Sequence, residues 1–348
     1  MEVLKHECGV AMIRLRKPLE FYHKKYGTWQ YALNKLYLLM EKQHNRGQEA
    51  AGIGAINSSI EPGSDYIFRE RAQGSSAIKE LFNGIQSTLR ALPKEQATDP
   101  KWAAANLPFA GEVLMGHLRY STTGRRGMQY VHPFLRRNSW KSKNLLLCGN
   151  FNLTNVDELF SSFIKDGQHP RILADTFLML EILGNNLDRS VQQVYDSNKG
   201  SNVTGVEMNS IISDTVDMAQ ILKESSEVWD GGYVICGITG DANAFAFRDP
   251  WGIRTAHYYY DDEVVVVAYE RAVIQTAFNV GSKYIKELQP GQALVVNKQG
   301  ERKLPQLRVA KALRPCYLER IYFSRGGDIV SYQVSKTLGK KLLKPIPN

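Results

Sequence analysis

A cysteine at the start of a predicted strand constrains this chain more than any other feature. Cys8 is followed by Gly9 and by an apolar run over residues 10–15, which predicts a buried strand directly after the thiol. Removal of residues 1–7 would place a free α-amine on the same residue as the sulfur. The reference pKa values of the two groups, about 7.7–8.0 and about 8.5, would let them share a proton near neutral pH. One residue would then supply nucleophile and base. The alternative, from this stretch alone, is an ordinary buried thiol behind a short tail.

The composition is typical of a folded, soluble protein, and the cysteine pattern indicates reduced thiols. The 348 residues are 43% hydrophobic and 23% charged, which suits one large domain or two smaller ones. The four cysteines lie far apart without a CxxC motif, so we expect no disulfide framework, no zinc site and a cytoplasmic location. No apolar run is long enough to span a membrane. Residues 1–7 lack the apolar core of a signal peptide.

The charge pattern gives a weak indication about partners. A formal net charge of +9 favours anionic ligands. The basic residues are spread along the chain, however, and no basic stripe is interleaved with aromatic residues. We therefore do not expect nucleic-acid binding.

Apolar periodicity predicts a succession of strands and helices. Strands are expected over residues 10–15, 50–56, 232–239, 244–247, 263–268 and 293–296, and helices from residue 28, over 75–92, from about 156, and over 173–184, 214–228 and 270–278. Residues 16–27 are expected to form a polar connection, and residues 93–108 an exposed insertion. Residues 314–325 are expected to be strand-like.

Several charged residues at the ends of predicted elements are candidates for binding. Arg119 ends an apolar strand and can grip a carboxylate with two parallel hydrogen bonds, although a structural ion pair explains it as well. Asp175 is in the first turn of a predicted helix, and Arg46 follows the end of another. Both are also candidates, but interaction with the helix dipole explains a negative charge at the start of a helix and a positive charge at its end equally well. His117, inside the strand before Arg119, is expected to be packed and hydrogen-bonded rather than a catalytic base.

An amide-rich loop follows the buried strand that begins at Leu145. Asn150, Asn152 and Asn155 lie within six residues of one another, just before a predicted helix. Amide side chains and backbone N–H groups at such a turn can stabilise a developing oxyanion. Turn and helix-cap chemistry is the commoner use of asparagine, and the residues alone leave both interpretations open.

Five motifs in the same order resemble the glutaminase part of the amidophosphoribosyltransferase family, over most of the chain. They are CGV at residues 8–10, RGQEAAG at 46–52, GHLRYST at 116–122, NFNLTN at 150–155 and FRDPWGIR at 247–254. Each motif alone is modest evidence, but their common order favours the catalytic interpretation of the first cysteine. The resemblance implies an α+β fold, the four-layer α/β/β/α sandwich of N-terminal-nucleophile hydrolases with two antiparallel sheets.

The resemblance also implies roles at the reacting end of the substrate, L-glutamine. Cys8 would attack the side-chain amide, and its freed α-amine would carry the proton. Asn150 and the backbone N–H of Phe151 would stabilise the oxyanion. The family usually has glycine where this chain has Phe151, which puts the local backbone and space in doubt. Arg46 resembles a residue that borders the nucleophile.

At the other end of glutamine, the resemblance implies a pair of opposite charges. Arg119 would bind the α-carboxylate and Asp175 the α-ammonium, and Thr122 would help to hold that end. Free glutamine carries one positive and one negative charge, so a fixed cation and a fixed anion are what its site needs.

The resemblance divides the chain into three parts. Residues 1–7 would be a propeptide, residues 8–305 the glutaminase domain, and residues 315–348 the truncated start of a phosphoribosyltransferase domain. The diphosphate-binding loop of that second domain is absent from the sequence. We therefore expect ammonia release without amination of a sugar phosphate. No cofactor or metal is expected for the glutaminase part, and magnesium only for the missing half. A phosphoribosyltransferase domain or subunit and a second copy of the chain are expected partners, and no membrane.

Two other functions remain open from the sequence. The glutaminase could serve another acceptor, as in the related glucosamine-phosphate or asparagine synthases, although the FRDPWGIR segment and residues 316–325 favour purine synthesis. Alternatively, an uncut leader would block the amine and leave a non-catalytic assembly module.

Overall fold

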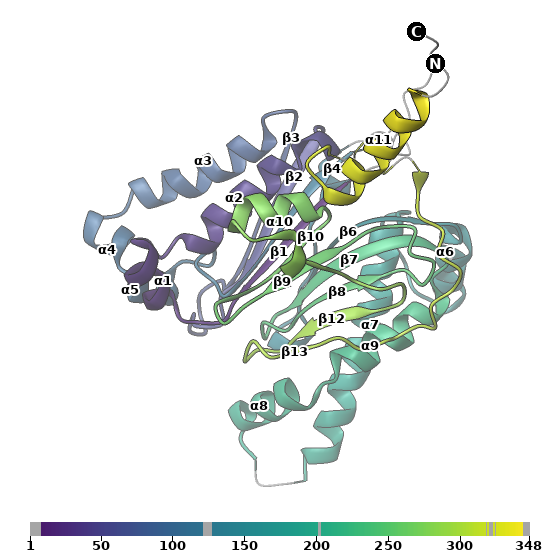
Figure 1. Ribbon diagram of the computed structural model, residues 1–348. Coiled ribbons are helices and arrows are strands. Elements are labelled where there is room, and N and C mark those ends of the chain that lie inside the picture. The colour runs from purple at the N-terminus through teal and green to yellow at the C-terminus, as the bar shows by residue number, and fades with distance from the viewer. Residues whose placement is uncertain are drawn as a thin grey trace.

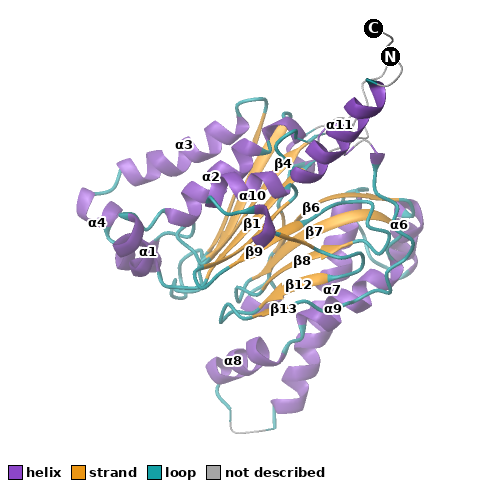
Figure 2. Ribbon diagram, viewed as in Figure 1, coloured by secondary structure: helices purple, strands orange, loops and turns teal. Residues whose placement is uncertain are grey.

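Two antiparallel sheets packed between helical layers form the framework of the protein (Figure 1, Figure 2). The computed structural model describes residues 8–120, 127–200, 203–317, 319, 323 and 325–343. The predicted four-layer α/β/β/α sandwich is confirmed. Within these residues, no helix combines the length and the apolar character needed to cross a lipid bilayer.

The first sheet is centred on the strand that follows Cys8. Its order is β11 (Lys286–Glu287), β9 (His257–Tyr260), β10 (Val264–Ala268), β1 (Gly9–Leu15), β4 (Val113–Arg119), β2 (Ala50–Ile56) and β3 (Ile67–Gln73), with all neighbours antiparallel. Gly9 lies opposite Leu118. Because Arg119 is the next residue of β4, this register places it beside the start of β1 and therefore beside Cys8.

The second sheet carries the amide-rich segment, which was predicted to be a loop but continues strand β6 as far as Leu153. Its order is β13 (Arg302–Lys303), β12 (Ala293–Val296), β8 (Ala244–Arg248), β7 (Gly231–Thr239), β6 (Leu145–Leu153) and β5 (Phe134–Arg136). The strands predicted over residues 232–239 and 244–247 are confirmed as β7 and β8, which pair with each other in antiparallel orientation. β5 pairs with β6 only as far as Leu147, so in the described structure residues 148–153 of β6 have no strand partner on that side.

Alternating side chains of the strands build three apolar layers. In β1, Ala11 and Ile13 pack against helices, whereas Val10 and Met12 face the second sheet. Strands buried on both faces appear in the sequence as continuous apolar runs rather than as apolar–polar alternation. This explains why the sequence predicts these strands from apolar runs.

Helices cover the outer face of each sheet (Figure 1). The first sheet is covered by α1 (Leu19–Tyr26), α2 (Tyr31–Lys42), α3 (Ala77–Arg90) and α10 (Arg271–Phe278), and the second by α6 (Val156–Lys165), α7 (Asp175–Asn198) and α9 (Met218–Ser225). Helix α8 (Gly205–Thr215) packs against α7 and lies beyond the sheet in Figure 1. Shorter or peripheral helices are α4 (Lys94–Thr98), α5 (Pro100–Asn106), α11 (Ile329–Leu342) and the 3-10 turns η1 (His44–Arg46), η2 (Met128–Tyr130), η3 (Lys141–Lys143), η4 (Ser226–Val228) and η5 (Ser282–Tyr284).

Two segments predicted as irregular contain helices. Residues 16–27 include α1, which buries only Leu19 and Tyr22, too few apolar residues to produce a clear periodic pattern. Residues 93–108 contain α4 and α5 and are less exposed than predicted, since Ala103 is fully buried.

Two other predictions require correction. The single helix predicted over residues 214–228 is interrupted, because the Asp217 side chain accepts hydrogen bonds from the first N–H groups of α9 and so starts a new helix. Residues 314–325 were predicted to be strand-like, but the described residues Tyr317, Glu319 and Phe323 have helical backbone.

A close approach between the two sheets depends on Gly52 in β2. A Cβ at this position would lie 1.8 Å from the carbonyl oxygen of His132 and 3.0 Å from Pro133 Cδ. The chain therefore enters β5 directly over the backbone of β2. This contact gives a structural reason for the glycine that ends the RGQEAAG motif.

We expect Gly52→Ala to lower the free energy of unfolding by about 1–3 kcal/mol or more, because the added methyl group meets backbone that cannot rotate away. Gly84→Ala is a matched control, since a Cβ at this exposed position in α3 meets nothing within 4 Å. It should raise stability by about 0.5–1 kcal/mol, through helix propensity. Denaturant unfolding of both variants measures the difference. Wild-type stability in Gly52→Ala would contradict the close approach.

Candidate active site

A cavity of about 250 Å³ lies where the start of β1, the end of β4 and β6 meet the beginning of α7. Its wall includes five of the seven predicted site residues: Cys8, Arg119, Asn150, Phe151 and Asp175. The structure therefore brings a thiol, amide donors and two opposite charges to one hollow from four elements that are distant in the sequence.

Cys8 is the cysteine that belongs to this cavity. It is half-buried, and its Sγ lies 3.9 Å from the carbonyl oxygen of Tyr120. Cys148 and Cys236 are fully buried, and burial raises the pKa of both thiols, that of Cys236 to about 12. Since the thiolate is the reactive form, those two thiols are inert. Cys316 is half-buried but is not part of the cavity wall.

The backbone of β6 presents donors to its unpaired edge. The N–H of Gly149 donates to His132 Nδ1 at 3.3 Å, and the carbonyl oxygen of Gly149 lies 3.0 Å from His117 Nε2. Both peptide groups of Gly149 thus point away from β7. Because every second residue of a strand points its peptide groups to the same side, the N–H of Phe151 faces this edge too. Asn150, between them, is almost completely buried and lines the cavity.

The phenyl ring of Phe151 occupies space that Gly149 leaves open. A Cβ on Gly149 would lie 2.3 Å from Cε1 of Phe151, and the ring stacks on His132 with centroids 5.5 Å apart. Phe151 itself lies within β6, so its backbone is extended. The doubt that the sequence raises about this position is therefore resolved for the backbone, since a phenylalanine fits without leaving the strand.

Two opposite charges lie at the other part of the cavity wall. Arg119 donates a hydrogen bond from Nη1 to the carbonyl oxygen of Tyr130, and its guanidinium lies 5.6 Å from the centre of the Tyr130 ring. Burial lowers the pKa of Arg119, while nearby Cys8, Glu49 and Asp175 raise it, so these groups lie within electrostatic reach of the guanidinium. Asp175 begins α7, where its Oδ1 accepts a hydrogen bond from the N–H of Thr176 at 2.8 Å.

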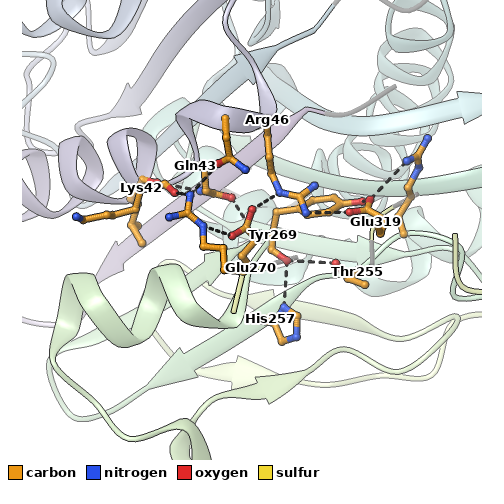
Figure 3. A network of polar contacts seen from close by, with 12 residues as sticks. Lys42, Gln43, Arg46, Thr255, His257, Tyr269, Glu270 and Glu319 are labelled. Carbon is orange, nitrogen blue, oxygen red and sulfur yellow. Dashed lines mark hydrogen bonds and ion pairs between the residues drawn. The ribbon is translucent and has the colours of Figure 1, made fainter. Parts of the chain in front are cut away.

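Of the other two predicted site residues, the structure describes only Arg46. Thr122 and the predicted propeptide, residues 1–7, lie outside the described residues. Arg46 is buried and does not belong to the cavity wall. Its guanidinium instead donates to Glu270 and, from Nη2, to Glu319 at 2.9 Å (Figure 3).

Glu319 is the centre of a buried ionic network that sequence reasoning missed. Besides Arg46, its carboxylate accepts from the hydroxyl of Tyr269 and lies 3.6 Å from Arg254 Nη1. Arg46 also stacks over the Tyr269 ring at 4.3 Å. The network joins the segment after β13 to Arg46 of η1 and to the residues that follow β10. In the sequence, Glu319 is visible only as an acidic residue among apolar ones, and this local pattern does not indicate which basic residues it pairs with.

Sequence analysis predicted only one of two stacked histidines, His117 and His132, of which His132 lines the cavity. His117 is packed and hydrogen-bonded to Gly149, as expected. His132, which no motif singled out, stacks on it with ring centroids 4.0 Å apart and contacts Thr176. Burial lowers the pKa of His117 to about 3 and that of His132 well below its ordinary value. Both rings are therefore neutral near pH 7.

The described residues contain no cluster of three or more His, Cys, Asp or Glu side chains that could ligate a metal ion. The described cavity wall offers a thiol at Cys8, side-chain amides at Asn150 and Asn152, one guanidinium, and the carboxylates of Asp157 and Asp175.

Comparisons with known proteins show extended similarity to amidophosphoribosyltransferases. The chain is 26% identical to the enzyme of Pasteurella multocida over 96% of its own length and 56% of that protein, and 24% identical to the enzyme of Archaeoglobus fulgidus over 89% and 56%. It therefore spans somewhat more than half the length of these curated relatives. No protein-family model matches the chain.

Solved structures show the same fold. Glutamine phosphoribosylpyrophosphate amidotransferase from Bacillus subtilis, complexed with ADP and GMP, superposes with a TM-score of 0.62 at 24% identity, covering 97% of this chain and 58% of that one. A second structure, described as the allosteric regulatory enzyme of purine biosynthesis, gives a TM-score of 0.59 at 23% identity, covering 91% and 53%. The two sheets and their helical layers thus follow a known architecture.

The buried histidines predict a stability that falls in acid. Between pH 6.5 and about 3 the native state binds fewer protons at His117 than the unfolded state does. The contribution of the neutral His117 to stability is therefore complete above pH 6.5 and is lost as the pH decreases. The free energy of unfolding falls by up to about 1.4 kcal/mol per pH unit. His117→Gln keeps an N–H donor but does not titrate. Between pH 7 and 4.5 this variant should lose less stability than the wild type, as measured by thermal unfolding. Equal losses would contradict the assignment.

Proposed function

We propose that this chain, which is a homologue of amidophosphoribosyltransferases over most of its length, hydrolyses L-glutamine to glutamate and ammonia. The observation that carries the proposal is the convergence of Cys8, Asn150, Arg119 and Asp175 on one cavity. A thiol next to amide donors suits attack on an amide, and the charge pair suits a free amino acid.

The first chemical step is attack on the side-chain amide of glutamine. Cys8 Sγ forms a bond to the amide carbon, and the carbonyl oxygen becomes an oxyanion. The Asn150 side-chain N–H and the Phe151 backbone N–H stabilise this charge. The Cys8 α-amine, once residues 1–7 are removed, takes the thiol proton and returns it to the nitrogen. The C–N bond breaks, ammonia leaves, and a thioester to Cys8 remains.

The second step restores the thiol. A water molecule attacks the thioester carbon while the Cys8 α-amine accepts a proton from it, and the same donors stabilise the second oxyanion. The carbon–sulfur bond breaks, the thiol regains a proton, and glutamate is released. Throughout both steps, Arg119 binds the α-carboxylate and Asp175 the α-ammonium, and Thr122 is proposed to assist there. Arg46, with its guanidinium paired to two carboxylates, is proposed to support the region next to the nucleophile rather than to bind substrate.

We propose that the ammonia is used to form phosphoribosylamine in purine synthesis. The names of the relatives support this acceptor, and the length of the relatives supports a phosphoribosyltransferase domain or subunit as partner, since the chain spans about 56% of them. No cofactor is needed for the glutaminase steps, and magnesium is expected only with the phosphoribosyl half. A nucleophilic thiol requires a reducing compartment, such as the cytoplasm.

Cys8→Ala should abolish glutamate and ammonia release, because no other thiol belongs to the cavity wall. The assay uses purified protein whose first residue is established by intact mass. Cys316→Ala is the control and should keep wild-type activity, since that thiol does not line the cavity. Protein that begins at Cys8 and releases no glutamate would refute the proposal, and a stable product that begins at Met1 would favour the assembly module.

Asn150→Ala should lower kcat for glutamine hydrolysis about 10²–10³-fold, which corresponds to about 2.7–4 kcal/mol of lost oxyanion stabilisation. KM should change little, because the donor acts on charge that develops in the transition state. Asn106→Ala, at an exposed position near the end of α5, is the control and should leave both constants unchanged. A loss confined to KM would show that Asn150 binds the substrate instead.

A further inference from the structure

A buried histidine connects the two halves of the cavity wall. We infer that His132 is a positioning residue for glutamine hydrolysis, which fixes the oxyanion segment of β6 relative to the helix that begins with Asp175. The inference rests on the proposed function. It adds a residue that none of the sequence motifs contains and that contacts both sides of the cavity.

The two ring nitrogens of His132 each contact a different side. Nδ1 accepts the hydrogen bond of the Gly149 N–H at 3.3 Å, one residue before Asn150. Nε2 lies 3.1 Å from the hydroxyl oxygen of Thr176, one residue after Asp175. A single rigid ring therefore spans from the strand that supplies the oxyanion donors to the first turn of α7.

The partners of His132 determine its tautomer. A backbone N–H can only donate, so Nδ1 must be an unprotonated acceptor in this contact. A neutral imidazole then carries its proton on Nε2, which donates to Thr176 Oγ1. The N–H of Thr176 donates in turn to Asp175 Oδ1 at 2.8 Å. This gives a directed chain of hydrogen bonds from Gly149 to the carboxylate proposed to bind the substrate ammonium.

Packing leaves the His132 ring no freedom to rotate. The residue is 4% exposed, and its ring stacks on His117 with ring centroids 4.0 Å apart and an interplanar angle of 16°. Phe134 meets it edge-on at 5.3 Å, and Phe151 lies at 5.5 Å. Its backbone is fixed as well, because its carbonyl group lies directly over Gly52.

His117 completes the arrangement from the first sheet. Its Nε2 donates to the carbonyl oxygen of Gly149, so the Gly149 residue is held through both of its peptide groups by two stacked imidazoles. His117 is also two residues before Arg119 on β4. The histidine pair thus connects the oxyanion segment to both elements that carry the charges proposed for the amino-acid end of glutamine.

This geometry predicts separate effects on the two ends of the substrate. The distance between the amide carbon and the α-carbon of glutamine is fixed by its covalent structure, so the site must hold its two halves at a matching distance. Misplacement of reacting groups by about 1 Å can reduce a rate about 100-fold. Loss of the Gly149 contact should act on kcat, and loss of the Thr176 contact on KM.

Two amide substitutions separate the contacts. In His132→Asn the side-chain oxygen can take the place of Nδ1 and keep the Gly149 bond, while the contact to Thr176 is lost. In His132→Gln the terminal amide can take the place of Nε2 and keep the Thr176 contact, while the Gly149 bond is lost. We expect kcat to fall about 10–100-fold in His132→Gln, and KM to rise with a smaller change of kcat in His132→Asn.

A double-mutant cycle with Thr176→Val tests whether the contact itself matters. The changes should be non-additive, so that His132→Asn with Thr176→Val is no worse than the poorer single variant. His257→Gln is the matched control, a buried histidine bonded to the carbonyl oxygen of Tyr269 away from the cavity wall, and should leave kcat and KM unchanged.

Nitrogen NMR of the imidazoles provides a readout that does not need activity. His132, assigned by the loss of its signals in His132→Gln, should appear as the neutral Nε2–H tautomer. If that variant does not fold, His132→Asn supplies the assignment. A proton on Nδ1, additive losses in the cycle, or wild-type kcat in His132→Gln would each overturn the inference. Wild-type protein that begins at Cys8 and releases no ammonia would instead refute the proposed function, while the tautomer would still test the contacts.

Discussion

The antiparallel register of β1 and β4 is the constraint on which the rest of the site depends. Gly9 lies opposite Leu118. The start of β1 and the end of β4 therefore bring the thiol of Cys8 and the guanidinium of Arg119 to the same end of the two central strands. A shift by one residue would turn alternate side chains of β1 from the helical layer to the second sheet, so the apolar layers on both faces oppose it. The position of the nucleophile is thus set by burial of residues that have no part in the chemistry.

The sequence alone was sufficient to identify site residues that lie at the end of a strand or helix. Cys8, Arg119 and Asp175 lie where apolar runs begin or stop, so polar side chains there indicated a site, and the order of the motifs supported the same architecture. The short helix α1 was missed because it buries only two side chains. The roles assigned to these residues remain predictions until variants are assayed.

Contacts between distant segments were beyond prediction from the sequence. Arg46 belongs to a recognisable motif, but its partners Glu270 and Glu319 are more than two hundred residues away and nothing in the local pattern indicates them. His132 likewise lies in a stretch without periodicity, and its role depends on the peptide groups of Gly149 and the first turn of α7. The side chains that a residue contacts depend on the whole fold, whereas a motif is recognised within one segment of the chain.

The phenyl ring over Gly149 has an evolutionary consequence. Because the ring of Phe151 fills the volume that a side chain at position 149 would need, the two positions are coupled across one strand face. A lineage with an aromatic residue at 151 must keep glycine at 149. Glycine at 151 would not release that requirement, because a Cβ at position 149 would also lie 2.5 Å from the carbonyl oxygen of Val234 in β7. Glycine at position 149 is therefore required by the backbone of the neighbouring strand as well as by the ring, so a change at position 151 alone does not free it to vary.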